Sequence, residues 1–231
     1  MRVVISLGGS TIFKDSEIDH NFIEKLSKLL VKLQRENFKF GVVTGGGIVA
    51  RKYISALRNL KASETICDIA GIKISRVNAL LLSAAIKANN GNATLLPCAD
   101  FNSALEAIES GKIAVMGGTE PGHSTDAVAA LLAEFVKADL FINASDVDYI
   151  YDKDPKKYRD AKKLEKVPIN KLLELTSKNS IEAGKFPLMD ILAVKIIERS
   201  KIRTIFLYAK DLSNLENAIK GKKFKGSEIT F

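Results

Sequence analysis

The stretch VMGGTEPGHSTDAVAALLAEFVKADL, residues 115–140, decides the fold of this chain. An apolar run that ends at Met116 passes into a turn rich in glycine, and residues 126–137 then have the apolar spacing of a helix. Glycine lets the backbone approach a bound group closely, because no Cβ intervenes. The free N–H groups at the start of the following helix favour an anion. The stretch therefore predicts a strand, an anion-binding turn and a helix, in that order.

The same alternation of strand and helix runs along the whole chain. Helical spacing covers residues 18–37, where Asp19 is a candidate N-cap, and it returns at 45–60. Such alternation is typical of a mainly parallel sheet with helices on both faces. We expect an α/β fold, a three-layer αβα sandwich, as a single domain of residues 1–231 with lobes of approximately 1–140 and 141–231. The expected strands are 2–7, 38–44, 92–97, 112–116, 139–144 and 202–208, and the other expected helices are 69–89, 102–109, 126–137, 169–177, 188–200 and 212–220.

Composition limits the class of protein. Of the 231 residues, 46% are hydrophobic and 27% are charged, which excludes a disordered chain. The apolar runs are shorter than the ~20 residues of a membrane span, and the start of the chain lacks a signal-peptide pattern. We therefore expect a cytoplasmic protein with no membrane partner. Cys67 and Cys98 lack metal-ligand spacing, so we expect both to be reduced and structural, with no zinc site.

The chain is basic, with 35 Lys and Arg against 27 Asp and Glu, which gives a net charge of +8. A surplus of this kind suits a partner that is a polyanion. Much of it lies at 156–166 and 220–226, which match no nucleic-acid motif. Solvated surface, contact with a nucleotide polyphosphate and nucleic-acid binding remain open for these two runs. We favour the first and expect no nucleic-acid partner.

Three glycine turns follow three expected strands: SLGGS at 6–10, TGGGIVARK at 44–52, and the turn in the opening stretch. Ligands of parallel α/β sheets bind at the carboxyl ends of the strands, where all three turns fall. The spacing of a P-loop is absent, and no GxGxxG sequence opens a helix. The turns predict one phosphate-binding crevice built on a different scaffold.

Further motifs extend along the chain. They are LGGS at 7–10, VVTGGGIVARKYI at 42–54, SETICDIAGIKISRVNALLL at 63–82, the opening stretch, DVDYIYDKDP at 146–155 and DILAVKII at 190–197. With these motifs the chain resembles the amino acid kinase superfamily, and within it the archaeal-type uridylate (UMP) kinases. The resemblance implies an amino acid kinase-like fold and the transfer of the γ-phosphoryl group of ATP to UMP, giving UDP and ADP in pyrimidine nucleotide biosynthesis. It also implies Mg2+ carried with ATP, no separate protein metal site, and a homohexamer that is a trimer of dimers.

The resemblance also assigns residues to the two substrates. The positions that match ATP contacts are Ser6, Leu7, Gly8, Gly9, Ser10, Gly47, Arg51, Ser145, Tyr151 and Asp154. The positions that match UMP contacts are Gly46, Asp68, Thr119, Glu120, Pro121, Gly122, His123, Ser124 and Thr125. Lys195 and Asp126 are the expected catalytic residues, as the cation at the transition state and as the carboxylate that orients the basic groups.

The chemistry of a phosphate acceptor suits these residues. The second pKa of a phosphate monoester is about 6, so the acceptor is already a nucleophile at neutral pH and needs no general base. The physical difficulty is repulsion between two anions, which backbone N–H groups, Mg2+ and a few cations reduce. We therefore expect direct in-line transfer without a covalent enzyme intermediate.

Several residues keep a structural alternative. Asp126 and Asp68 are also candidate helix caps, although the carboxylate of Asp68 could equally accept both ribose hydroxyls. Lys195 and Arg51 are also explained as solvated charges on amphipathic helices. A structural hydrogen bond explains His123 as well as nucleotide contact does. Tyr151 would either pack on adenine or anchor its loop.

The match departs from the family at several positions, one of them the run KFPLMD at 185–190, where relatives often have small, serine-rich residues. Ser6 stands where many members of the superfamily carry lysine, so one cation is missing near the donor phosphates, and Tyr149 replaces a common glycine on the adenine side. Two other functions stay open: a related kinase that forms an acyl phosphate or an isoprenoid diphosphate, and a non-catalytic nucleotide- or oxyanion-binding protein of the same fold.

Overall fold

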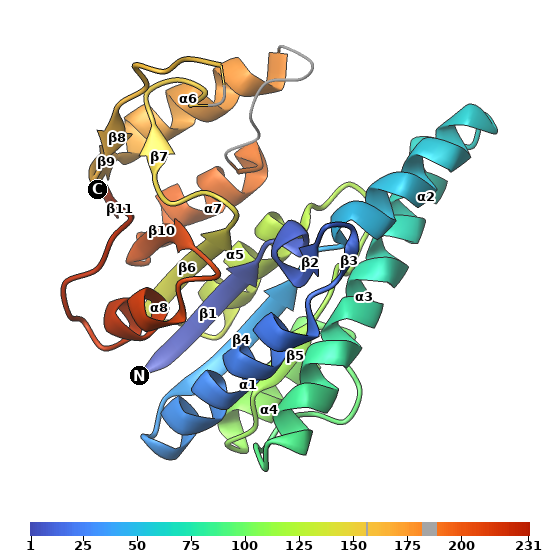
Figure 1. Ribbon diagram of the computed structural model, residues 1–231, viewed down its shortest axis with the longest axis vertical. Coiled ribbons are helices and arrows are strands. Elements are labelled where there is room, and N and C mark those ends of the chain that lie inside the picture. The colour runs from blue at the N-terminus through green and yellow to red at the C-terminus, as the bar shows by residue number, and fades with distance from the viewer. Residues whose placement is uncertain (156, 182–188) are drawn as a thin grey trace.

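The structure is a computed structural model that describes residues 1–155, 157–181 and 189–231 (Figure 1). Helices and strands alternate along most of the chain, as the sequence predicts. The elements are β1 (Arg2–Leu7), the 3-10 helix η1 (Gly9–Ile12), β2 (Phe13–Lys14), β3 (Glu17–Ile18), α1 (His20–Arg35), β4 (Lys39–Thr44), α2 (Gly47–Asn59), α3 (Glu64–Ala88), α4 (Phe101–Glu109), β5 (Ala114–Met116), α5 (Thr125–Phe135), β6 (Leu140–Ser145), β7 (Ile150–Tyr151), β8 (Lys163–Leu164), β9 (Lys166–Pro168), α6 (Ile169–Ile181), α7 (Ile191–Ser200), β10 (Thr204–Tyr208), α8 (Leu212–Ile219) and β11 (Ser227–Thr230).

A seven-stranded sheet runs through the molecule in the order β5-β4-β1-β6-β10-β11-β9. Its neighbouring strands are parallel except for β10 and β11. Two hydrophobic clusters cover the two faces, because alternate side chains of a strand point to opposite sides. Ile5 of β1 packs in one cluster with α1, α3 and α8, and Val4 packs in the other with α4, α5 and α7. The expected three-layer α/β sandwich with a mainly parallel sheet is confirmed.

The register of the central strands sets the position of the glycine turns. Leu7, the last residue of β1, lies opposite Thr44 of β4 and Ala144 of β6. The chain therefore leaves these three strands at the same level of the sheet. This shared edge is the carboxyl edge, where the turns at 8–10 and 45–47 begin.

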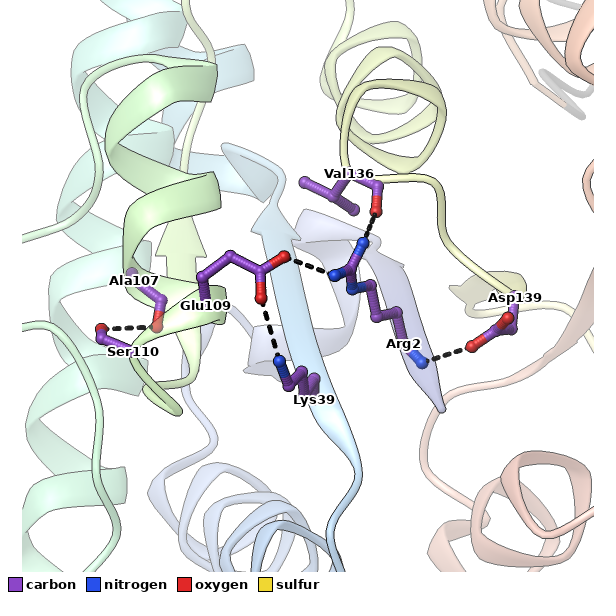
Figure 2. A network of polar contacts seen from close by, with 7 residues as sticks. All are labelled: Arg2, Lys39, Ala107, Glu109, Ser110, Val136 and Asp139. Carbon is purple, nitrogen blue, oxygen red and sulfur yellow. Dashed lines mark hydrogen bonds and ion pairs between the residues drawn. The ribbon is translucent and has the colours of Figure 1, made fainter.

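The opposite, amino edge of the sheet is held by a polar network (Figure 2). The Arg2 guanidinium donates to the Val136 carbonyl at 2.8 Å and pairs with Glu109, which also accepts from Lys39 Nζ at 3.0 Å. The Arg2 amide donates to Asp139 Oδ2 at 2.6 Å. These bonds lower the pKa of Glu109, chiefly through Lys39. The network joins α4, β1 and β4 far from the glycine turns.

Three sequence predictions differ from the structure. Residues 92–97 form no strand and keep only the bridge Ala93 to Ile113, since Leu95 and Leu96 face solvent and Pro97 has no N–H to donate. The helix expected at 69–89 begins earlier, at Glu64, because Ser63 caps it. The helix expected at 188–200 is α7, capped by Asp190; residue 188 lies outside the described residues.

Helix α3 is, by length and composition, the one helix of the described ranges that could cross a membrane. Its residues Ala79, Leu82 and Ile86 are instead buried in the core beside α1 and the sheet. The apolar residues on this face of the helix therefore serve packing. Cys67 on this helix is buried and free, as is Cys98, in agreement with the structural role expected for both.

Candidate active site

The first and second glycine turns touch each other at the carboxyl edge. A Cβ on Gly9 would lie 2.2 Å from the Gly47 amide nitrogen, and one on Gly47 would lie 2.4 Å from the Gly9 carbonyl oxygen. Gly47 also has a φ of +64°, which L side chains rarely adopt. Only glycine fits this contact, so two segments far apart in sequence form one backbone surface.

The third turn packs against α3, and α3 also contacts the second turn. A Cβ on Gly117 would lie 2.5 Å from the Arg76 amide nitrogen, so the turn packs directly on the backbone of α3. The same turn of α3 also contacts the second glycine turn. Asn78 Nδ2 of α3 donates to the Gly45 carbonyl at 2.8 Å, and Thr44 Oγ1 at the end of β4 donates to the Ser75 carbonyl of α3 at 2.9 Å. The three turns therefore share one region, as the sequence predicts.

A cavity of about 190 Å³ lies between α2, α3 and the third turn. Five of the residues expected to contact UMP are on its wall, and they come from three separate segments. Its lining is Gly46, Ala50, Ile54, Asp68, Gly71, Ile72, Ser75, Gly118, His123, Ser124 and Thr125. His123 lies on this wall, and its expected contact with the nucleotide stays a prediction.

Asp68 faces the third turn from the second turn of α3. Its Oδ2 accepts a hydrogen bond of 2.8 Å from the Gly122 amide. Interpretation as a helix cap is wrong, because Ser63 caps α3 by accepting from the Ile66 amide. Oδ2 thus holds the turn, while the carboxylate still has acceptor capacity for a ligand.

Asp126 lies in the first turn of α5, directly after the third glycine turn. Its Oδ1 accepts from Ser6 Oγ at 2.7 Å and from Asn143 Nδ2 at 3.0 Å. Burial of the carboxyl, and then the nearby charge of Asp190, raise the pKa of Asp126. Capping does not explain it, because Ser124 is the N-cap of α5. Asp126 joins the ends of β1, β6 and α5.

Asp190 connects the third turn to α7. Its Oδ2 accepts from Ser124 Oγ at 2.8 Å, and its Oδ1 caps α7 by accepting from the Leu192 amide at 3.0 Å. The beginning of the helix that carries Lys195 is thereby tied to a residue on the wall of the cavity.

Lys195 and Arg51 are the two expected cations, and both side chains are exposed. Lys195 Nζ lies 2.9 Å from Glu198 Oε2, one turn along the exposed face of α7. Arg51 is in the second turn of α2. Among the described residues no ion pair joins either cation to Asp126. Their expected contacts with phosphate stay predictions.

The expected donor side follows β6. Gly8 donates to the Ala144 carbonyl at 2.9 Å, which places the first turn beside Ser145. The Tyr151 hydroxyl donates to Asp148 Oδ1 at 2.7 Å, and burial together with this bond raises the pKa of Tyr151. Lys163 pairs with Asp148 and lies 4.6 Å from the centre of the Tyr149 ring. The loop-anchor interpretation of Tyr151 therefore has direct support.

The remaining expected donor residues are placed by their backbone. The Asp154 carbonyl accepts from the Lys157 and Tyr158 amides and closes a turn. Ser6 and Leu7 are each 2% exposed, so their side chains pack inside the sheet. Ser10 lies in η1, directly after Gly9. Any contact of Ser6 or Leu7 with ATP would have to use backbone atoms.

Four residues that hold the site were not selected from the sequence. Ser75, Arg76 and Asn78 lie on one turn of α3, and Asn143 lies on β6. Their signal is a polar residue inside an otherwise apolar run, in KISRVNALLL and LFINAS. The sequence marks them as unusual, but only the structure names their partners.

No cluster of three or more His, Cys, Asp or Glu side chains within the described ranges is arranged to hold a metal ion.

Comparison with known proteins agrees with this geometry. Residues 1–207 match the profile of the amino acid kinase family. The uridylate kinase of Thermococcus kodakarensis is 45% identical over 223 residues, covering 96% of both chains. The crystal structure of uridylate kinase from Archaeoglobus fulgidus has a TM-score of 0.86 at 43% identity, covering 100% of both chains. The UMP kinase structure from Ureaplasma parvum, at 23% identity and a TM-score of 0.82, supports the fold. The chain therefore belongs to the amino acid kinase family, and its close relatives within that family are archaeal uridylate kinases.

Proposed function

We propose that the protein is a UMP kinase that transfers the γ-phosphoryl group of ATP to UMP, giving UDP and ADP. The observation that carries the proposal is the cavity whose wall combines Gly46, Asp68 and residues 123–125, beside the contact of the first two glycine turns. Relatives named uridylate kinase, at 45% identity over nearly the whole chain, support the same substrate. The reaction would supply pyrimidine nucleotides.

The two substrates would meet at the carboxyl edge of the sheet. UMP would occupy the cavity of the lobe formed by about 1–140, with its ribose at Asp68. ATP would lie along the ends of β1, β6 and β7, in the lobe formed by about 141–231. The N–H groups of the first two turns, free of Cβ atoms, would lie between the two sets of phosphates.

In this arrangement the chain needs no nucleophile of its own. The phosphate of UMP is ionised at neutral pH and attacks the γ-phosphorus directly, in line with the leaving ADP. Asp126 would position the reacting edge, since it fixes Ser6 on β1 and Asn143 on β6. Lys195 would neutralise charge at the transition state once its weak, exposed pairing with Glu198 is exchanged for phosphate.

The residues at this edge fit Mg2+ bound with ATP. The charge of Asp190 contributes to the raised pKa of Asp126, a repulsion that a divalent cation would relieve. Mg2+ prefers oxygen ligands and is commonly held by one or two carboxylates together with substrate phosphates. It would supply charge neutralisation to the transferring group.

The proposal is tested by ADP release, measured with ATP and Mg2+ against UMP, CMP, acetylglutamate and isopentenyl phosphate. Turnover with UMP above the other acceptors is expected. Turnover with acetylglutamate or isopentenyl phosphate in its place would identify a related kinase. Nucleotide binding without any ADP release would identify a binding protein.

We also propose a homohexamer, as a trimer of dimers, in the cytoplasm. Ile66, Val77 and Leu80 are apolar but 41–64% exposed along α3, which supports self-association of this helix. Light scattering coupled to size exclusion should give the mass of six chains. A monomer at micromolar concentration would contradict the assembly without affecting the proposed reaction.

A further inference from the structure

Arg76 of α3 donates hydrogen bonds to two carbonyl groups of the third glycine turn. Its Nε donates to the Gly118 carbonyl at 2.9 Å, and its Nη2 donates to the Thr119 carbonyl at 3.4 Å. The side chain is half-buried, and Arg76 does not line the cavity, whereas Gly118 does. Arg76 therefore acts on the turn and not on the contents of the cavity.

The neighbouring residue of α3, Ser75, binds the other polar backbone group of Gly118. Ser75 Oγ accepts from the Gly118 amide at 2.8 Å while it donates to the Ile72 carbonyl at 2.7 Å. Both polar backbone groups of Gly118 are thus bound to adjacent residues of one helix. A Cβ on Gly118 would lie 3.0 Å from Ile72, so the turn sits tightly on α3.

These carbonyl bonds also orient two N–H groups. The described part of the chain has no cis peptide bond, and in a trans peptide the N–H points opposite to the carbonyl. Since Arg76 binds the carbonyls of Gly118 and Thr119, the amides of Thr119 and Glu120 point away from the guanidinium. Neither amide has a hydrogen-bond acceptor among the residues that the structure describes. Thr119 is half-buried and Glu120 is exposed, so both amides are open to an acceptor on a ligand or to water.

We propose that Arg76 is a positioning residue that turns the Thr119 and Glu120 amides toward the acceptor nucleotide. This inference rests on the proposed function. The ligand groups that fit are oxygens of the nucleotide, either a uracil carbonyl or the monophosphate. Without the two carbonyl bonds, either peptide is free to rotate and offer its carbonyl oxygen, which would repel the same ligand oxygen.

The test compares Arg76→Met with Lys73→Met. Both replacements remove one positive charge from α3, but Lys73 is exposed. In Arg76→Met the KM for UMP should rise on the order of 10-fold, which corresponds to ~1.4 kcal/mol. The KM for ATP and kcat at saturating UMP should stay within about twofold of wild type. Arg76→Lys, which retains a charged donor, should recover part of the affinity, and Lys73→Met should match wild type.

Three outcomes would overturn the inference. In the first, the KM for UMP is the same in Arg76→Met and Lys73→Met. In the second, Arg76→Met raises the KM for ATP and lowers kcat to the same extent, which indicates a general structural loss. In the third, Arg76→Met fails to fold and Arg76→Lys binds UMP, measured by calorimetry without ATP, as wild type does. Failure of the wild-type enzyme to phosphorylate UMP would instead contradict the proposed function, so the two failures are distinguishable.

Discussion

Ser6 and Asp126 are 120 positions apart in the chain, yet Ser6 Oγ donates a 2.7 Å hydrogen bond to Asp126 Oδ1. The same oxygen also accepts from Asn143. Ser6 stands where many superfamily members carry a lysine, so a neutral hydroxyl replaces a cation beside this carboxylate. Asp126 is therefore partly desolvated without a neutralising partner among these contacts, and the raised pKa follows from that.

Asp126→Asn should separate activity from stability. The folded protein binds a proton at Asp126 more readily than the unfolded chain, whose carboxyl keeps its usual pKa of about 3.8. The ionised carboxylate therefore costs stability as pH rises through the raised pKa. The variant should have a higher Tm than wild type at pH 7 to 8, with the difference shrinking as pH falls toward 4. Its kcat should fall on the order of 10²-fold. A lower Tm at pH 8 would contradict the interpretation.

Asp68→Asn should weaken the acceptor site. The carboxylate holds the Gly122 amide and is the expected partner of the ribose hydroxyls, and an amide has only one oxygen for both tasks. We expect the KM for UMP to rise on the order of 10-fold, with the KM for ATP nearly unchanged. Initial rates with each substrate varied in turn measure both. An unchanged KM for UMP would count against the ribose assignment.

Lys195→Met should lower kcat on the order of 10²-fold or more, since it removes a cation expected at the transition state. Lys171→Met is the matched control, because Lys171 also forms an exposed 2.9 Å pair with a glutamate three residues later. The control should retain wild-type kcat. Equal rates in the two variants would mean that Lys195 is only a solvated charge on α7.

Gly117→Ala should destabilise the fold, because the added Cβ would lie 2.5 Å from the backbone of α3. Misfit at a packed backbone contact costs on the order of 1–3 kcal/mol. At Gly71 the Cβ would meet only Ile54 at an ordinary 3.5 Å, so Gly71→Ala is the control. Urea denaturation should separate the two variants. Equal stability would show that the third turn can move off α3.

Glu109→Gln should affect stability and not activity. Lys39 and Arg2 lower the pKa of Glu109, so its contribution exists above its usual pKa of 4.5 and is lost as pH falls through the folded value. The Tm difference from wild type should be present at pH 7 and disappear in acid. Glu106→Gln, an exposed position on the same helix, should show no such pH dependence. Loss of UMP turnover in Glu109→Gln would contradict the expectation that this network at the amino edge does not affect the active site at the carboxyl edge.

Much of the fold follows from periodicity and glycine placement. Strand β1 and the helices after the glycine turns were predicted because apolar spacing and turn residues agree there. Residues 92–97 were mispredicted because an apolar run alone does not reveal whether a neighbouring strand exists to accept its hydrogen bonds. The short strands β9 and β11 give no periodic signal, since each has only three or four residues.

The amino-acid sequence by itself determined the α/β class, the three glycine turns and the family, because these depend on local spacing and on motifs. It could not determine that Ser75 and Arg76 hold the turn at Gly118, or that one oxygen of Asp126 serves both Ser6 and Asn143. Those pairings depend on which elements the sheet order brings together. Hydrogen bonds between distant segments form only after packing has fixed their distance and direction, and this was decided by the tertiary structure.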